Sequence, residues 1–205
     1  MQPADPRKLP RQRRSQATVD VILEATTRVF DDLGYEATTT NRVAERAGVS
    51  IGSVYQYFPN KDALLTALHE RHIDEVTASV ASVLNTGAAR PWREQLRAVV
   101  DEILRLHTQR PRLQQVLHLE RPWLERPSAD SNGTRRLAQA AAQWLVRHRD
   151  GMTIIDVDAA AETVLRLIEG MVHAAVLDRR GNAVDASVAT SIREAVEGYL
   201  VVPRG

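Results

Sequence analysis

One short segment, TTTNRVAERAGVSIGSVYQYFPNK at residues 38–61, most constrains what this chain can fold into. Gly48 separates two stretches of helical spacing, and a sharp turn there needs a residue that tolerates positive φ. Hydroxyl residues precede both stretches, at Thr38–Thr40 and at Ser50, and such side chains cap helix N-termini. The segment therefore predicts two short helices, at about 41–47 and 51–58, joined by a tight turn.

The second of these helices has an outward face of uncommon chemistry. Val54 is placed to face the core, which leaves Ser53, Gln56 and Tyr57 pointing outward on a face without charge. An ordinary helical hairpin with a solvated face is the alternative, but such a face usually carries Lys and Glu. Small polar and aromatic side chains instead suit base edges in a DNA major groove. We therefore predict a helix-turn-helix.

The same residues resemble the DNA-binding domain of the TetR (tetracycline repressor) family. The resemblance covers roughly residues 15–68, and the pattern G-V-S-x-G-[ST]-hydrophobic-Y-x-[YH]-F-x-x-K is complete from Gly48 to Lys61. Position 51 is often Lys in the family and is Ile here, which replaces a possible phosphate contact with an apolar group suited to a thymine methyl. The DNA-binding residues that the resemblance implies are Thr39, Thr40, Arg42, Ser50, Ile51, Gly52, Ser53, Tyr55, Gln56, Tyr57 and Lys61.

The charge of the chain is unevenly distributed. The formal net charge of the 205 residues is only +1, yet residues 7–14, RKLPRQRR, contain five basic side chains and no acid. A basic arm directly before a helix-turn-helix can lie along DNA or in its minor groove, and a disordered solubilising tail is the equally open alternative. We predict a basic flexible arm at 1–14, a DNA-binding domain at 15–60 and a ligand-binding and dimerisation domain at 61–205.

Composition limits the other classes of protein. Hydrophobic residues make up 43% of the chain, which is enough for a core. The sequence contains no run of about 18 apolar residues, so no membrane span is predicted. The polar, Arg-rich start of the chain does not resemble a secretory signal. The absence of cysteine excludes disulfides and is compatible with the cytoplasm, which is the predicted location.

Helical periodicity continues to the end of the chain, and no strand pattern competes with it. We predict an all-α fold of about nine helices, with a three-helix helix-turn-helix domain followed by a larger helical domain. The helices expected at about 157–178 and 185–201 resemble the family's dimer bundle in layout; the alternative is that the first of them is simply the central core helix. The predicted homodimer interface contains Val172, Ala175, Val196 and Tyr199.

The resemblance also implies a cavity for a small-molecule effector, for which the sequence offers only candidates. Aromatic, histidine and other residues able to line it are Trp92, Trp123, Trp144, His107, His118, Arg121, His148, Glu169, Met171 and His173. His69 and His72 are spaced i, i+3 on one helix, but no third metal ligand is evident, so no metal is predicted. From this set we predict ligand-binding roles for His118, Arg121, Trp123, Trp144, Glu169 and His173.

The function that follows is a DNA-binding transcriptional regulator, a repressor released from a pseudo-palindromic operator by an unidentified effector. Two alternatives stay open: a helix-turn-helix protein without an effector, which predicts a filled core, and an enzyme. The chain contains no Walker A loop, no G-x-S-x-G elbow, no H-E-x-x-H motif and no dinucleotide-binding turn, so no catalytic residue and no cofactor is predicted.

Overall fold

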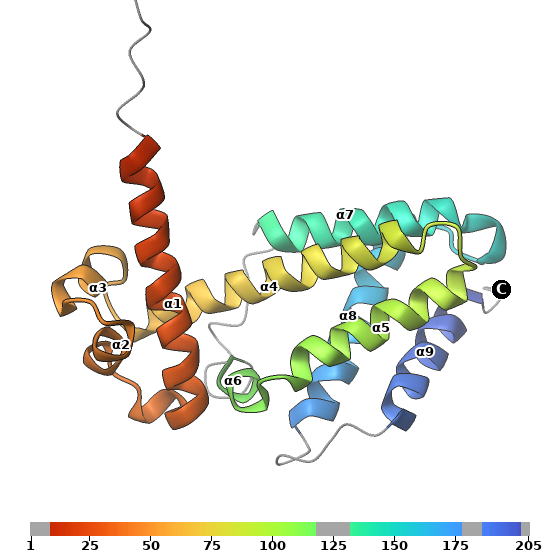
Figure 1. The fold of residues 1–205 in the computed structure, drawn as a ribbon. Coiled ribbons are helices and arrows are strands. Elements are labelled where there is room, and N and C mark those ends of the chain that lie inside the picture. The colour runs from red at the N-terminus through yellow and green to blue at the C-terminus, as the bar shows by residue number, and fades with distance from the viewer. Residues whose placement is uncertain (1–8, 118–131, 178–185, 202–205) are drawn as a thin grey trace, which may run out of the picture. The chain divides into compact units, whose positions relative to one another are not determined.

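The computed structural model describes residues 9–117, 132–177 and 186–201, which form nine α-helices and no strand (Figure 1). The predicted all-α fold is confirmed. Two compact units divide the chain between Leu68 and His69, inside the helix α4 (Lys61–Thr86). Among the described helices, none is both long and apolar enough to cross a membrane.

The first unit contains α1 (Leu9–Ala37), α2 (Thr40–Ala47) and α3 (Ile51–Tyr57), followed by the start of α4. The helix α1 begins at Leu9, inside the segment predicted as a flexible arm, while residues 1–8 lie outside the described residues. Within α1 the helical path breaks at Gly34, whose φ of 75° favours glycine. The core of this unit is formed by side chains with almost no exposed surface, which are Ile22, Phe30, Tyr35, Val43, Val54, Leu64 and Leu65.

Tyr35 ties the end of α1 to the start of α4. Its ring stacks on Phe30 with centroids 6.0 Å apart, and its hydroxyl donates a hydrogen bond to Asp62. The backbone carbonyl of Tyr35 accepts a hydrogen bond of 3.1 Å from Lys61 Nζ, which also lies 4.0 Å from the ring centroid. One buried aromatic residue thus sets where α4 begins relative to the helix-turn-helix.

The second unit contains the rest of α4 and the helices α5 (Trp92–Thr108), α6 (Pro111–Gln115), α7 (Asn132–Arg147), α8 (Val157–Leu177) and α9 (Ala186–Val201). A 3-10 turn, η2 (Arg149–Gly151), follows α7. Within this unit α8 packs against α5, α6, α7 and α9. Two prolines and a glycine in the sequence predict a loop at residues 121–134, but α7 already begins at Asn132, so this prediction is wrong in its last three residues.

The early start of α7 depends on a close approach to α4. A Cβ atom on Gly133 would lie 2.8 Å from Ile73 Cγ2, too close for any other residue unless Ile73 moves. The carbonyl of Gly133 accepts a hydrogen bond of 3.3 Å from the buried Thr77 hydroxyl of α4. This contact brings the first turn of α7 against α4, where it forms one wall of the cavity described below.

Candidate DNA interface and ligand cavity

The turn between α2 and α3 is built from local hydrogen bonds. Thr39 caps α2, its hydroxyl accepting from the Arg42 backbone N–H at 3.3 Å. Gly48 ends α2 in the left-handed region with φ 66°, and the Val49 N–H donates to the Ala44 carbonyl at 3.1 Å. These contacts lie within a few residues of one another, which is why the sequence alone predicts this turn.

The helix α3 presents the predicted reading face. Ser50 caps it by accepting a hydrogen bond of 3.1 Å from the Ser53 N–H, and Val54 is fully buried. Tyr55 is 53% exposed and Gln56 is exposed beside it. The Tyr55 hydroxyl lies 3.2 Å from the Thr40 hydroxyl, so the first turn of α2 and the outer face of α3 meet at one hydrogen bond. Ile51 and Gly52, two further predicted DNA contacts in the first turn of α3, are exposed as well.

Three predicted contact residues are engaged within the unit itself. Tyr57 is half-buried, and its hydroxyl accepts a hydrogen bond of 3.1 Å from Ser15 Oγ of α1. The ammonium of Lys61 contacts Tyr35, and the Arg42 guanidinium donates to the Ala37 carbonyl. In this arrangement each of the three side chains supports the fold, and a DNA contact by any of them stays a prediction.

Gly52 has no evident structural requirement for glycine. Its φ is not positive, and a Cβ atom there would meet only the Ser50 hydroxyl, at 3.8 Å. A glycine inside a helix costs about 0.5–1 kcal/mol relative to alanine. The fold of the single chain therefore does not explain why glycine stands here.

The second unit encloses a cavity of about 150 Å³ between α4, α5, α7 and α8. Of the twelve described residues that line it, six are aliphatic, four are histidines and one is an acid, Glu169. The lining residues are His69, His72, Ile73, Val76, Ile103, His107, Thr134, Leu137, Leu165, Ile168, Glu169 and His173.

The histidines form a cluster whose proton positions follow from geometry. His107 Nδ1 lies 2.8 Å from the Ile103 carbonyl, and since a carbonyl can only accept, Nδ1 carries the proton. In the neutral ring His107 Nε2 is then an acceptor, so His72 Nε2, 3.2 Å away, is the donor. The His173 ring lies 5.4 Å from that of His107, centroid to centroid.

Burial holds this cluster in its neutral form. Desolvation, reinforced by the charge that neighbouring histidines would carry, lowers the pKa of His72 to about 3 and that of His173 to about 4. Desolvation also lowers the pKa of His69 and His107, and it raises the pKa of Glu169. Among the described residues, no three such groups are arranged to hold a metal ion.

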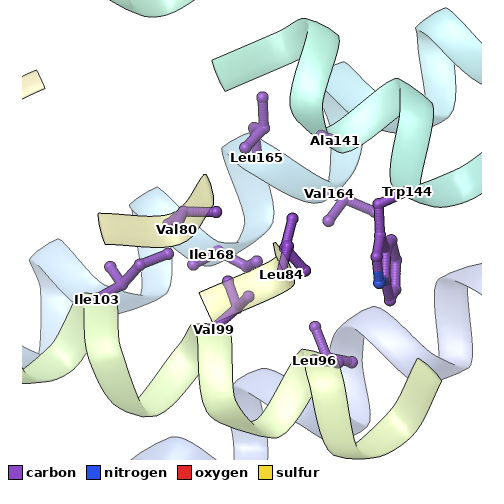
Figure 2. A pocket seen from close by; sticks show the side chains of 10 residues that line it. All are labelled: Val80, Leu84, Leu96, Val99, Ile103, Ala141, Trp144, Val164, Leu165 and Ile168. Atoms are coloured by element: carbon purple, nitrogen blue, oxygen red, sulfur yellow. The ribbon is translucent and has the colours of Figure 1, made fainter. Parts of the chain in front are cut away.

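A smaller cavity of about 40 Å³ adjoins the first and shares Ile103, Leu165 and Ile168 with it (Figure 2). Its wall is apolar apart from the Trp144 indole N–H, which donates a hydrogen bond of 3.0 Å to the buried Gln95. Figure 2 shows aliphatic side chains from α4, α5 and α8 surrounding the space, with Trp144 at one end. Together the two cavities provide a mostly apolar space with one polar, histidine-rich end.

The predicted ligand residues are distributed between these cavities. Glu169 and His173 line the larger one and Trp144 lines the smaller one, while His118, Arg121 and Trp123 lie outside the described residues. The prediction omitted His69 and His72 as cavity residues and kept His107 only as a wider candidate. The i, i+3 spacing on α4 was the available signal, but nothing in the sequence places α5 and α8 opposite it.

The four residues predicted at a dimer interface differ in accessibility. Val172 and Val196 have no exposed surface in the single chain and belong to its core, so neither side chain can contact a partner subunit in this arrangement. Ala175 and Tyr199 are half-buried and keep some surface for such a contact.

Comparison with known proteins agrees with this division into a helix-turn-helix and a cavity-bearing unit. A family model for bacterial regulatory proteins of the tetR family matches residues 22–68, and a model for the tetracyclin repressor-like C-terminal domain matches residues 91–200. The chain belongs to the TetR family. This confirms the resemblance noted at residues 15–68 and extends it to the second unit.

Curated TetR-family relatives are similar over part of their length. The chain is 39% identical over 95 residues to the HTH-type transcriptional activator FasR of Mycolicibacterium smegmatis, which covers 46% of this chain and 40% of FasR. It is 36% identical over 80 residues to the HTH-type transcriptional regulator BetI 1 of Chromohalobacter salexigens, 39% of each chain. The matches thus span about two fifths of these relatives.

Solved TetR-like structures share the fold over most of the chain. The fatty acid degradation regulator FadR of Bacillus halodurans superposes with a TM-score of 0.71 at 19% identity, covering 87% of this chain and 94% of FadR. FadR of Bacillus subtilis, solved with stearoyl-CoA, gives 0.67 at 19% identity and covers 86% and 96%. RolR, solved with resorcinol, gives 0.68 at 16% identity and covers 93% and 91%.

Substitution of Gly52 by alanine tests whether DNA binding by α3 requires a residue without a Cβ atom at this position. Gly52→Ala should raise the free energy of unfolding by about 0.5–1 kcal/mol, because the helix gains propensity and the Cβ meets no clash. Affinity for DNA should fall at least tenfold in a fluorescence anisotropy assay. Unchanged affinity would show that DNA does not approach α3 closely at this position.

Acid should destabilise the histidine cluster before other parts of the unit titrate. The pKa of His72 and His173 is lower in the folded chain than the 6.5 of an exposed histidine, so only the unfolded chain takes up these protons as pH falls below 6.5. Urea unfolding should show full stability above pH 6.5 and a loss, towards pH 4, of up to about 1.4 kcal/mol per pH unit for each such histidine.

The matched variants for this measurement are His72→Gln, which cannot titrate, and Gln139→Ala on the exposed face of α7. His72→Gln should show a shallower dependence of unfolding free energy on pH, whereas Gln139→Ala should follow the wild type. Equal slopes for wild type and His72→Gln would mean that His72 is not held neutral by the fold.

Proposed function

We propose that this TetR-family chain is a homodimeric transcriptional regulator that binds a pseudo-palindromic operator and leaves it when a small molecule fills the histidine-lined cavity. The observation that carries the DNA-binding part is the outer face of α3. That face is exposed and uncharged, and it contains a glycine that the fold does not require. Operator DNA places such a regulator in the cytoplasm.

Base reading is assigned to the exposed middle of α3. Gln56 offers both a donor and an acceptor to a base edge, and Ile51, 37% exposed, offers an apolar contact for a thymine methyl. Thr40 and Tyr55, joined by their hydroxyls, lie at the border between this face and α2. Ser50 and Ser53 position the first turn through their mutual hydrogen bond of 2.8 Å.

An effector explains the cavity better than an architectural role does. A DNA-binding protein without an effector predicts a filled core, whereas about 150 Å³ of space lies between four helices of the second unit. FadR of Bacillus subtilis and RolR, which share the fold, were solved with stearoyl-CoA and resorcinol respectively. A ligand that binds one conformation of this unit more tightly shifts the population towards it and so changes operator affinity.

Dimerisation through α8 and α9 is supported by a glycine on each helix. Gly170 and Gly198 are exposed, and a Cβ atom on either would meet nothing within 4 Å in the single chain. Each glycine weakens its helix, so a reason outside the single chain is needed, and close approach of a partner helix supplies one. Two reading heads on one dimer combine weak contacts into a specific one.

Gln56→Ala tests the assignment of the reading face. An operator is first selected from a random DNA pool by the wild type, and all its single-base variants are then measured with both proteins. Gln56→Ala should lose about 1–3 kcal/mol at one base-pair position and should lose discrimination there. Gln139→Ala, on the exposed face of α7, is the control and should match the wild type. A variant that reads every position as the wild type does excludes Gln56 as a base reader.

Gly170→Glu tests the dimer interface. A charged side chain at the proposed seam should split the dimer, because an unpaired carboxylate buried in a two-fold interface costs several kcal/mol. Light scattering should report the monomer mass, with helicity retained and operator binding weakened by at least tenfold. The control Gln139→Glu should remain a dimer. A dimeric Gly170→Glu would place the interface elsewhere, and a monomeric variant with full operator affinity would refute the two-headed mechanism.

A further inference from the structure

The four histidines of the larger cavity can take up protons, a property that an effector cavity does not require in general. His69 and His72 come from α4, His107 from α5 and His173 from α8, while α7 adds only the uncharged Thr134 and Leu137. Among the described lining residues there is no Lys or Arg, and the one acid is Glu169, on whose charge Arg166 of α8 acts. Within this described set, the imidazoles are the groups that can take up a proton and so balance an anion in the space.

We infer that the cavity takes a small aromatic or similarly compact acid, whose carboxylate enters together with one proton that the His72–His107 pair accepts. This inference rests on the proposed function, since it names the chemical class of the effector. A cavity of about 150 Å³ is large enough for a benzene ring. The adjoining cavity of about 40 Å³, which shares three lining residues, leaves space for substituents.

The reason for coupling proton and anion is desolvation. An isolated imidazolium in this wall costs free energy, and burial accordingly lowers the pKa of His72 to about 3 and that of His173 to about 4. An isolated carboxylate among aliphatic side chains costs as much. When both enter together they form a charge-assisted hydrogen bond, and the net charge of the cavity does not change.

The geometry of the His72–His107 pair suits this proton. Two imidazole nitrogens 3.2 Å apart already share one proton, and the outer Nδ1–H of His107 is held by the Ile103 carbonyl. A second proton taken up by His72 makes both of its ring nitrogens donors. The complex thus forms from the protein, one free anion and one proton from solution. The new N–H bond on the imidazole is the only covalent change.

The residues of the cavity wall disfavour a cationic ligand and a metal ion. A cationic ligand would meet four imidazoles and, among the described lining residues, Glu169 as the single acid able to balance it. A metal ion finds no three ligands in suitable positions within the described residues. A neutral ligand would leave the affinity independent of pH, which makes the proton the decisive observable.

Isothermal titration calorimetry of the full chain with benzoate tests the inference. Benzamide serves as the neutral isostere and benzylamine as the cation. The dissociation constant of benzoate should rise about tenfold per pH unit between pH 6 and 8, and buffers of different ionisation enthalpy should show uptake of about one proton. Benzamide should bind more weakly and without pH dependence, and benzylamine should not bind.

Two variants separate the cluster from other surfaces. Glu169→Gln removes the one acid of the wall and should tighten benzoate binding, whereas it would weaken binding of a cation or a metal ion. The double variant His72→Gln/His107→Gln should lose at least tenfold in affinity at pH 6 together with the proton uptake. Gln139→Ala, on the exposed face of α7 in the same unit, is the control and should behave as the wild type.

Several results would overturn the inference. The first is that benzoate does not bind at millimolar concentration, and the second is that benzamide binds as tightly as benzoate. The third is that the wild type binds benzoate without taking up a proton. All three are measured on the wild type and so do not depend on the folding of the double variant. Stoichiometric Ni²⁺ binding that is lost in Glu169→Gln would make the cluster a metal site instead. Operator binding is measured separately. A chain that binds DNA but fails these tests refutes the acid ligand alone, and a chain that binds no DNA refutes the regulator.

Discussion

The architecture of the second unit depends on the burial of α8. Its apolar residues occupy more than one side of the helix, so α5, α7 and α9 must each cover part of it. Ala160, Val164, Ile168 and Val172 are almost completely buried by these neighbours. Because α8 is held from several sides, the positions of Glu169 and His173 at the cavity follow from packing and not from any local preference.

Incomplete filling on the α4 side of α8 turns this core into a candidate binding site. Close packing normally leaves few voids larger than a water molecule. Here the approach of Gly133 to Ile73 closes the wall between α7 and α4, while histidines take positions that aliphatic residues would fill in an ordinary core. A wall that contains neutral imidazoles becomes strongly polar when a proton is added, which is a suitable property for a responsive site.

The first unit solves a different problem with short-range contacts. Caps at Thr39 and Ser50 and the left-handed Gly48 fix two short helices that would be unstable alone. Tyr35, buried between Phe30, Lys61 and Asp62, then holds the start of α4 against α1. Gln56, Tyr55 and Ile51 remain exposed on the outer side of α3, and for this reason we assign recognition to them rather than to the half-buried Tyr57.

The sequence by itself determined the helix-turn-helix and the all-helical fold, because capping, turn chemistry and helical period act between residues a few positions apart. The family followed from the resemblance of the motif at Gly48 to Lys61. The sequence also identified Glu169 and His173 as candidates, but not their association with His72 and His107. Long-range packing alone decided that Tyr57 and Lys61 contact their own unit and that Val172 and Val196 lie in the core. Which face of a helix is covered, and by what, depends on how separate helices pack, and an amphipathic pattern records only that a face must be covered.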